Sequence, residues 1–342
     1  MSDEILLDVK GLKTYFFLDE GIVKAVDGVD FQVKRGSTIG IVGESGCGKS
    51  VTAFSILKLI TKPGRIAGGE IILYSNAGGT EASPQQEVID IAALPDDSRR
   101  LRDIRGREIA MIFQEPMTSL SMMYTVGDQI VEAIQLHFTL SDEDARKRAI
   151  EMLGRVGIPK PEQRIDDFPF QLSGGMRQRV MIAMALSCNP SLLIADEPTT
   201  ALDVTTQAQI LELMLHLQEE MGMAIMMITH DLGVVAEICD EVVVMYLGEV
   251  VEQADVDSLF HDPQHPYTQA LLKSIPVLGK SKEGRLNPIE GTVPDPYNRP
   301  SGCPFHTRCE QVIIGRCDVI HPELTKLSDG RAVRCLLYSD EA

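Results

Sequence analysis

The chain has 342 residues, a length that suits one large domain with an appendage, or two domains, and that can bury a substantial core. Its 50 acidic and 32 basic residues give a net charge of −18, which disfavours a protein that works on nucleic acid, because this charge repels a phosphate backbone. The longest apolar runs fall short of the ~20 residues that cross a bilayer, and the first residues lack a basic region, so we expect a cytoplasmic protein without a signal peptide.

The N-terminal part of the chain predicts antiparallel strands. Apolar and polar residues alternate over residues 5–9 and 28–33, on either side of a turn at 19–21. Alternation with a period of two is typical of half-buried strands. Residues 38–42 follow as a short apolar run, which favours a buried strand.

The first motif that indicates a chemistry begins where this run ends and leads into residues 51–57, whose apolar positions have helical spacing. The motif consists of Gly43, Glu44, Ser45, Gly46, Cys47, Gly48, Lys49 and Ser50. Its glycines let backbone N–H groups converge on a phosphate, and the start of the helix adds positive charge. We expect Lys49 to reach the β and γ phosphates and Ser50 to bind Mg²⁺, so the turn predicts a site for ATP or GTP.

The middle of the chain predicts a hairpin, a further buried strand and a helical subdomain. Residues 70–74 form a predicted strand, followed by a loop of small residues at 75–82. Residues 108–113 form another apolar strand, and Gln114 stands at its end. From 126 to 156 the apolar spacing is helical, which indicates a helical subdomain.

The second half of the chain alternates helices and strands. Helices are predicted at 174–188 and 204–221, and strands at 191–195, 224–229 and 241–247. This alternation predicts an α/β fold with a largely parallel sheet. Prolines become frequent beyond residue 255, which favours loops and one short helix at 267–274.

Polar side chains that suit phosphoryl transfer follow several of these strands. The strand at 191–195 leads into Asp196 and Glu197, which we assign to the Mg²⁺ shell and to activation of the attacking water. Gln114 can reach the metal or the water through its amide, and His230 can donate to the γ-phosphate or orient Glu197. Taken singly, the two carboxylates are also compatible with an exposed acidic turn, and His230 with a structural role.

A second glycine pair opens a second helix. Leu172 precedes Ser173, Gly174 and Gly175, and this helix start is a second candidate phosphate-binding site. Because it lies between the loop at 43–50 and the strand at 192–197, the chain resembles the ATPase cassette of ABC transporters. Gln114, the segment 201–203 and His230 also follow in the order of that family.

The resemblance covers about residues 6–256 and implies a P-loop NTPase core with an antiparallel β subdomain and a helical subdomain at about 120–172. An upstream aromatic residue stacks on adenine in this family, and Phe16 is the first candidate, with Tyr15 next and a strand-packing role as the alternative. Two cassettes pair head to tail in this family, so Ser173 and Gly175 would face the nucleotide held by Lys49 of the other cassette.

Residues 260–276 and 291–296 look like the tail of ATPase subunits from dipeptide and oligopeptide importers, so residues 1–255 are expected to form the cassette and 256–342 an extension. The resemblance implies a second related ATPase, two membrane permeases and an indirect extracytoplasmic binding protein as partners, at the cytoplasmic face of the membrane. The chain looks like the first ATPase of such a pair, although Ser121 and Met122 replace the Asn-Pro common in the family. Importers of oligosaccharides, glutathione or nickel remain alternatives, as does a soluble ABC ATPase that acts on ribosomes or DNA.

Four of the seven cysteines lie near the C-terminus, at Cys303, Cys309, Cys317 and Cys335. The surrounding segment is too short and proline-rich for a large core, so we expect a metal to staple it. The absence of Cys-x-x-Cys pairs disfavours a zinc ribbon and favours a [4Fe–4S] cluster, and some peptide-importer ATPases carry a cluster at a similar cysteine set. Zinc, free thiols and disulfides remain alternatives.

Overall fold

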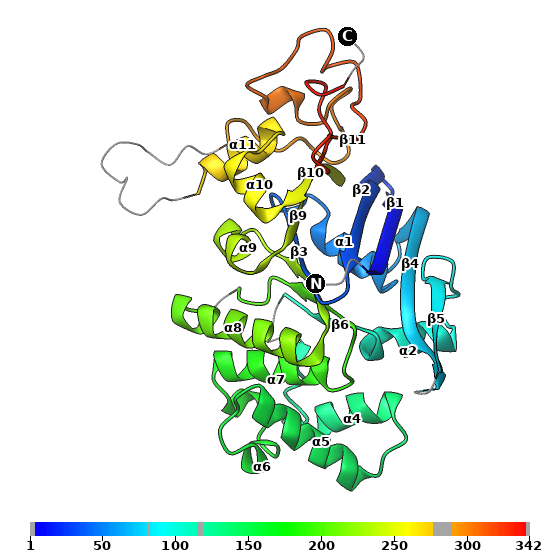
Figure 1. Ribbon diagram of the computed structural model, residues 1–342, viewed down its shortest axis with the longest axis vertical. Helices are drawn as coiled ribbons and strands as arrows, with labels where there is room; N and C mark the ends of the chain where they lie inside the picture. Colours follow the sequence, from blue (N-terminus) through cyan, green and yellow to red (C-terminus); the bar gives the residue numbers. More distant parts are fainter. Residues whose placement is uncertain (1–3, 81–82, 115–118, 201, 276–288, 340–342) are drawn as a thin grey trace.

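The computed structural model describes residues 4–80, 83–114, 119–200, 202–275 and 289–339. The chain forms two sheets with helices packed around them (Figure 1). The strands are β1 Ile5–Leu18, β2 Gly21–Lys34, β3 Thr38–Val42, β4 Gly64–Thr80, β5 Ser83–Asp90, β6 Ile109–Ile112, β7 Leu192–Asp196, β8 Ala224–Ile228, β9 Glu241–Tyr246, β10 Glu249–Asp255, β11 Thr325–Lys326 and β12 Ala332–Val333. The helices are α1 Lys49–Ile56, α2 Arg99–Arg107, α4 Val126–His137, α5 Asp142–Arg155, α6 Pro161–Arg164, η1 Pro169–Gln171, α7 Gly174–Leu186, α8 Val204–Met221, α9 Leu232–Ile238, α10 Val256–His261, α11 Pro266–Lys273 and η2 His306–Arg308.

The larger sheet has the strand order β11-β12-β10-β9-β3-β8-β7-β6. Its centre, from β9 through β3 and β8 to β6, is parallel, as the alternation of helices and strands predicted. Every residue of β3, β7 and β8 is buried, because layers of structure cover both faces of this sheet. The functional loops therefore start from the carboxyl ends of rigid, buried strands.

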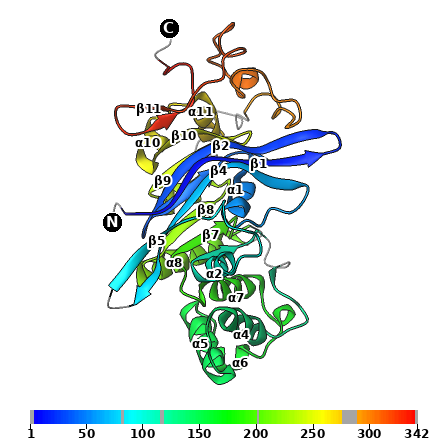
Figure 2. The same ribbon diagram turned by 90° about the vertical axis from the view of Figure 1, so that its right-hand side faces the viewer.

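The smaller sheet is antiparallel, with the order β2-β1-β4-β5 (Figure 2). It packs with α1 and α2 on one face of the larger sheet, where their apolar side chains form one of two core clusters. The other cluster lies on the opposite face and includes side chains of α4, α5, α7 and α8. This arrangement confirms the predicted antiparallel strands in the N-terminal segment.

One prediction in the middle of the chain is wrong in its extent. The expected loop of small residues at 75–82 is largely strand, because β4 continues to Thr80 and pairs with β5, which begins at Ser83. Small and polar residues disfavour strands locally, but backbone pairing with a neighbouring strand overrides that preference. The hairpin itself is confirmed, and it is longer than predicted.

Candidate nucleotide-binding and catalytic site

The phosphate loop connects β3 to α1, and close backbone contacts require two of its glycines. Gly43 has φ 148°, and a β-carbon there would lie 2.2 Å from the Met245 carbonyl oxygen. Gly48 has φ 101° and caps α1, and a β-carbon there would lie 2.3 Å from the Ala25 carbonyl oxygen. Side chains are excluded at both positions, so the loop can keep its tight curve only with glycine.

Lys49 is the buried cation of this loop. Its Nζ donates to the carbonyl oxygens of Gly43, at 2.7 Å, and Glu44, at 3.1 Å. Cys47 is also buried, whereas Ser45 and Gly46 are exposed at the outer curve. The positive charge of Lys49 is therefore held inside the turn at the N-terminus of α1, which is an arrangement that suits a phosphate group.

Asp196, the last residue of β7, has the surroundings of a Mg²⁺ ligand. Its Oδ1 is buried and has no hydrogen-bond partner within the described residues. Burial raises the pKa of this carboxyl above its ordinary value, while a hydrogen bond from Ser50 opposes the rise. A buried carboxylate oxygen without a partner is unfavourable unless a cation binds it, so Asp196 and Ser50 fit a magnesium site.

The structure brings the three predicted catalytic side chains together around Glu197. Gln114 Nε2 donates to Glu197 Oε2 at 2.9 Å, and His230 Nδ1 lies 3.0 Å from Oε1. The Glu197 backbone has φ 47°, a conformation that non-glycine residues adopt rarely and that often marks functional positions. The side chains come from the ends of three neighbouring strands, β6, β7 and β8, which explains why they meet.

Thr200 is a fourth member of this group that the sequence alone did not reveal. Its Oγ1 donates to Glu197 Oε2 at 3.0 Å. The available signal was its position three residues after the carboxylate, at the start of the connection to α8. Burial acts to raise the pKa of Glu197, but the hydrogen bonds from His230, Thr200 and Gln114 outweigh burial and hold this pKa below its ordinary value. The carboxylate is therefore ionised at neutral pH.

The second glycine pair, Gly174 and Gly175, lies at the start of α7. Ser173 caps α7, and its hydroxyl accepts a hydrogen bond from the Met176 backbone N–H. Ser173 and Gly174 are exposed, and Gly175 is half-buried. Both views show α7 apart from α1, so one chain does not bring this helix start to its own phosphate loop (Figures 1 and 2).

The two adenine-stacking candidates point to different surroundings. The ring of Phe16 lies against Gly64, where a β-carbon would come within 2.6 Å of a ring carbon. Tyr15 donates a hydrogen bond from its hydroxyl to Asp27 Oδ1, and Lys24 lies over its ring. Neither contact tests stacking on adenine, so the choice of Phe16 stays a prediction.

The four C-terminal cysteines lie in one region but form no recognisable metal site. Within the described ranges, no group of three or more histidine, cysteine, aspartate or glutamate side chains is placed to hold a metal ion. Burial, with smaller contributions from the neighbouring thiols of Cys335, Cys317 and Cys309, raises the pKa of Cys303 to about 12. The four cysteines are free rather than disulfide-bonded. The described residues thus do not show the expected iron–sulfur cluster, although the thiols of Cys309, Cys317 and Cys335 lie close enough to Cys303 to affect its pKa.

Three features define an ATP-binding cassette of the ABC type: a phosphate loop, a strand that leads into Asp196 and Glu197, and a separate serine-glycine helix start. Residues 26–200 match the family model "ABC transporter", and residues 251–317 match "Oligopeptide/dipeptide transporter, C-terminal region". A bacterial ABC transporter cassette solved as a dimer superposes with a TM-score of 0.62 at 30% identity, covering 73% of this chain and 99% of the cassette. The same cassette in a post-hydrolysis dimer, bound to ADP and phosphate, superposes equally well.

Relatives of nearly the same length narrow the family further. The chain is 50% identical over 98% of its length to an oligopeptide transport ATP-binding protein of Bacillus subtilis, of which it covers 98%. It is 48% identical to the dipeptide transport ATP-binding protein of Escherichia coli, with 98% of each chain covered. The chain belongs to the family of ATP-binding subunits of oligopeptide and dipeptide ABC transporters. None of the helices in the described part of the chain has the length and apolarity needed to cross a membrane.

Proposed function

We propose that this chain binds and hydrolyses ATP to drive the import of dipeptides or oligopeptides across the cytoplasmic membrane. The observation that carries the proposal is the group of Gln114, Glu197 and His230 at adjacent strand ends, in a chain whose relatives of similar length are named as oligopeptide and dipeptide transport ATP-binding proteins. Importers of oligosaccharides, glutathione or nickel use the same ATPase chemistry and are the alternative cargoes. A soluble ABC ATPase acting on ribosomes or DNA is the less favoured alternative.

The residues of the site have separate roles in this proposal. Residues 43–50 cradle the phosphates, with Lys49 at the β and γ phosphates and Phe16 at the adenine. Ser50, Asp196 and Gln114 would hold Mg²⁺, which would neutralise charge on the phosphates. Glu197 accepts a proton from the attacking water, and His230 orients this carboxylate through its 3.0 Å contact. Lys49→Ala is expected to abolish tight ATP binding, and a normal ATP affinity would contradict this arrangement.

The chain is proposed to act in a pair of cassettes. Ser173, Gly174 and Gly175 would complete the nucleotide site of a second, related ATPase, which explains why they lie apart from the phosphate loop of their own chain. Two permeases would hold the pair at the cytoplasmic face of the membrane, and an extracytoplasmic protein would deliver the peptide. In this proposal residues 1–255 are the cassette, with a helical subdomain at about 120–172, and residues 256–342 are the C-terminal extension.

Reconstitution tests this assignment. The chain, its partner ATPase and the two permeases in proteoliposomes should take up a labelled peptide only with ATP, and turnover should exceed that of the lone chain. Uptake of a labelled sugar or of nickel instead of peptide would show that the transported cargo is not a peptide. Full activity of a demonstrably monomeric chain would exclude the shared site.

We propose further that Cys303, Cys309, Cys317 and Cys335 hold a [4Fe–4S] cluster that staples the extension, with zinc as the alternative metal. The proximity of the Cys335, Cys317 and Cys309 thiols to Cys303, which shows in their effect on its pKa, supports this proposal. Four thiolates are a suitable ligand set for either metal. Protein purified without oxygen should be brown and contain about four irons per chain. Colourless protein with one zinc per chain would establish the alternative.

A further inference from the structure

The C-terminal extension touches the phosphate loop directly through Arg308. The guanidinium of Arg308 makes a two-pronged ion pair with Glu44, the second residue of the loop, with Nη1–Oε2 at 2.7 Å and Nη2–Oε1 at 3.0 Å. The Arg308 side chain is only 3% exposed and that of Glu44 is 25% exposed. A two-pronged pair of this kind fixes the orientation of both groups as well as their distance.

A second part of the extension holds the backbone of the same residue. The Glu44 N–H donates to the Tyr267 hydroxyl at 2.8 Å, and Tyr267 is a fully buried residue of α11. Glu44 is therefore fixed at its main chain by α11 and at its carboxylate by η2. These two contacts come from segments on either side of residues 276–288, which lie outside the described part of the chain.

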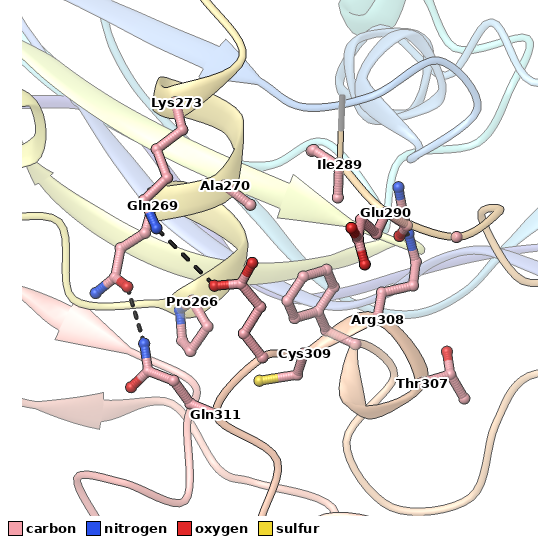
Figure 3. Close-up of a pocket in the computed structure, with 13 residues that line it drawn as sticks. Pro266, Gln269, Ala270, Lys273, Ile289, Glu290, Thr307, Arg308, Cys309 and Gln311 are labelled. Carbon is pink, nitrogen blue, oxygen red and sulfur yellow. Dashed lines mark hydrogen bonds and ion pairs between the residues drawn. The ribbon is translucent and has the colours of Figure 1, made fainter. Parts of the chain in front are cut away.

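Other contacts also hold the Arg308 side chain in place. The rings of Tyr246, Tyr267 and Phe305 pack against one another with centroids 4.8 to 5.4 Å apart, and the Arg308 guanidinium lies about 6 Å from two of them. Arg308 Nε also donates to the Glu290 carbonyl oxygen at 3.1 Å. Figure 3 shows Arg308 beside Glu290, on a wall of the hollow between α11 and residues 289–311. Such preorganisation lets a side chain position another group at little entropic cost.

The position of Glu44 matters because the rest of the phosphate loop is built on it. The Glu44 carbonyl oxygen accepts from Lys49 Nζ at 3.1 Å and from the Cys47 N–H at 3.3 Å. Leu271 and Val293 of the extension also line a cavity of about 430 Å³ with Gly43, Glu44, Ser45 and His230. A shift of Glu44 therefore changes the place of Lys49 and the shape of the loop that receives phosphate.

We propose that Arg308, supported by the Tyr267 hydroxyl, is a positioning residue through which the C-terminal extension sets the ATP affinity of the cassette. The proposal rests on the proposed function only in taking the phosphate loop as the ATP site. Arg308 does not touch the nucleotide; it holds Glu44, and Glu44 holds the loop. The extension is thus part of the nucleotide site and not only an appendage to it.

The test measures binding of a fluorescent ATP analogue with Mg²⁺ to the purified full-length chain, with the dissociation constant and the number of sites as readouts. Arg308→Gln should weaken binding roughly tenfold, within the range of coupling between residues of one network. Arg308→Lys keeps the charge but loses the two-pronged contact, so it should recover only part of the affinity. Tyr267→Phe keeps the ring and removes the hydroxyl, and it should weaken binding by a smaller factor.

Arg331→Gln is the matched control, because it removes a paired arginine of the extension that contacts Asp262 and Asp329 rather than the loop. It should leave the affinity unchanged. Glu44→Gln combined with Arg308→Gln should bind no more weakly than Arg308→Gln alone. If Arg308→Gln and Tyr267→Phe both bind with the parental dissociation constant, the contact is structural and the proposal is wrong. This holds even if the number of competent sites falls. If the unaltered chain binds no ATP, the proposed function fails instead.

Discussion

The interior of the cassette and the attachment of the C-terminal extension rely on apolar packing and charged contacts in different proportions. In the cassette, β3, β7 and β8 are buried along their whole length, and two apolar clusters cover both faces of the sheet. The described part of the extension adds β11 and β12, two residues each, and it meets the cassette through buried side chains such as Tyr267 and Phe305 and through arginine ion pairs. Hydrophobic burial spreads stability over many residues, whereas each charged contact of the extension depends on a single group of paired side chains.

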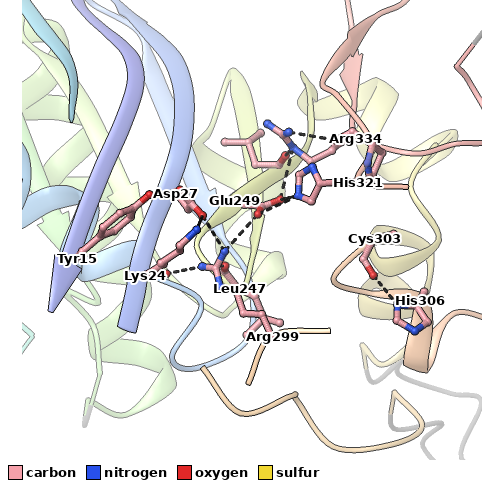
Figure 4. Close-up of polar contacts among 12 residues, drawn as sticks. Tyr15, Lys24, Asp27, Leu247, Glu249, Arg299, Cys303, His306, His321 and Arg334 are labelled. Atoms are coloured by element: carbon pink, nitrogen blue, oxygen red, sulfur yellow. Dashed lines mark hydrogen bonds and ion pairs between the residues drawn. The ribbon is translucent and has the colours of Figure 1, made fainter. Parts of the chain in front are cut away.

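Glu249 is the centre of the second group of such contacts (Figure 4). Its carboxylate is 5% exposed and faces Arg299 at 3.3 Å, His321 at 3.0 Å and Arg334 at 3.9 Å. Arg299 also pairs with Asp27, so it joins the extension to the N-terminal sheet. The catalytic groups are thus fixed by the core of the cassette, while the attachment of the extension includes ion pairs that single substitutions can remove.

The largest expected effect is on catalysis in the cassette. Glu197→Gln removes the proton acceptor and should lower ATP turnover by roughly a thousandfold, while ATP binding is retained and paired cassettes accumulate. Turnover is measured with the assembled transporter and pairing by light scattering. Glu212→Gln, an exposed change on α8, is the control. Parental turnover in Glu197→Gln would show that another group accepts the proton.

A core substitution should lower the stability of the cassette as a whole. Ile41 in β3 is fully buried, so Ile41→Ala should lower the free energy of unfolding by about 4 kcal/mol through lost burial and a cavity. Ile41→Val removes one methylene and should cost only about 1 kcal/mol. Urea unfolding curves measure both. Equal effects of the two changes would mean that the strand is not tightly packed.

Loss of a charged anchor should loosen the extension alone. Glu249→Gln leaves Arg299, His321 and Arg334 without their carboxylate and should destabilise the attachment by about 3 kcal/mol. Hydrogen exchange should accelerate in residues 289–339 and stay unchanged in β3 and β7. Glu323→Gln, an exposed carboxylate of the same segment, is the control. Acceleration in β3 to the same extent would show that the two regions unfold together.

Acid should loosen the extension by a smaller amount. Burial lowers the pKa of His265 to about 3, and its Nδ1 accepts the Tyr267 N–H at 3.0 Å, which requires the neutral ring. Below pH 6.5 the unfolded chain binds a proton that the folded chain excludes, so stability falls as the pH drops from 6.5 toward 3. The loss should be about 2 kcal/mol at pH 5. His265→Asn keeps an N-cap acceptor and should remove this part of the pH dependence, as hydrogen exchange of α11 can measure.

The sequence predicted those parts of the site that depend on local order. Residues 43–50, Asp196, Glu197, Gln114 and His230 stand at strand ends, and parallel strands bring their carboxyl ends to one edge. The contact of Thr200 with Glu197 was not predicted, because threonine is common in loops. Arg308 and Arg299 could not be predicted, because their partners Glu44 and Asp27 are 264 and 272 residues away and no periodicity links them.

The separation of Arg308 from Glu44 has a consequence for protein synthesis. During translation, Glu44 is added 264 residues before Arg308. At ~5–20 residues per second, this interval lasts roughly 13 to 50 seconds. During this interval the emerging chain has a phosphate loop whose Glu44 has neither Arg308 nor, for most of the time, Tyr267 beside it. The nucleotide site of a newborn subunit therefore reaches its final form only as the last part of the chain is made.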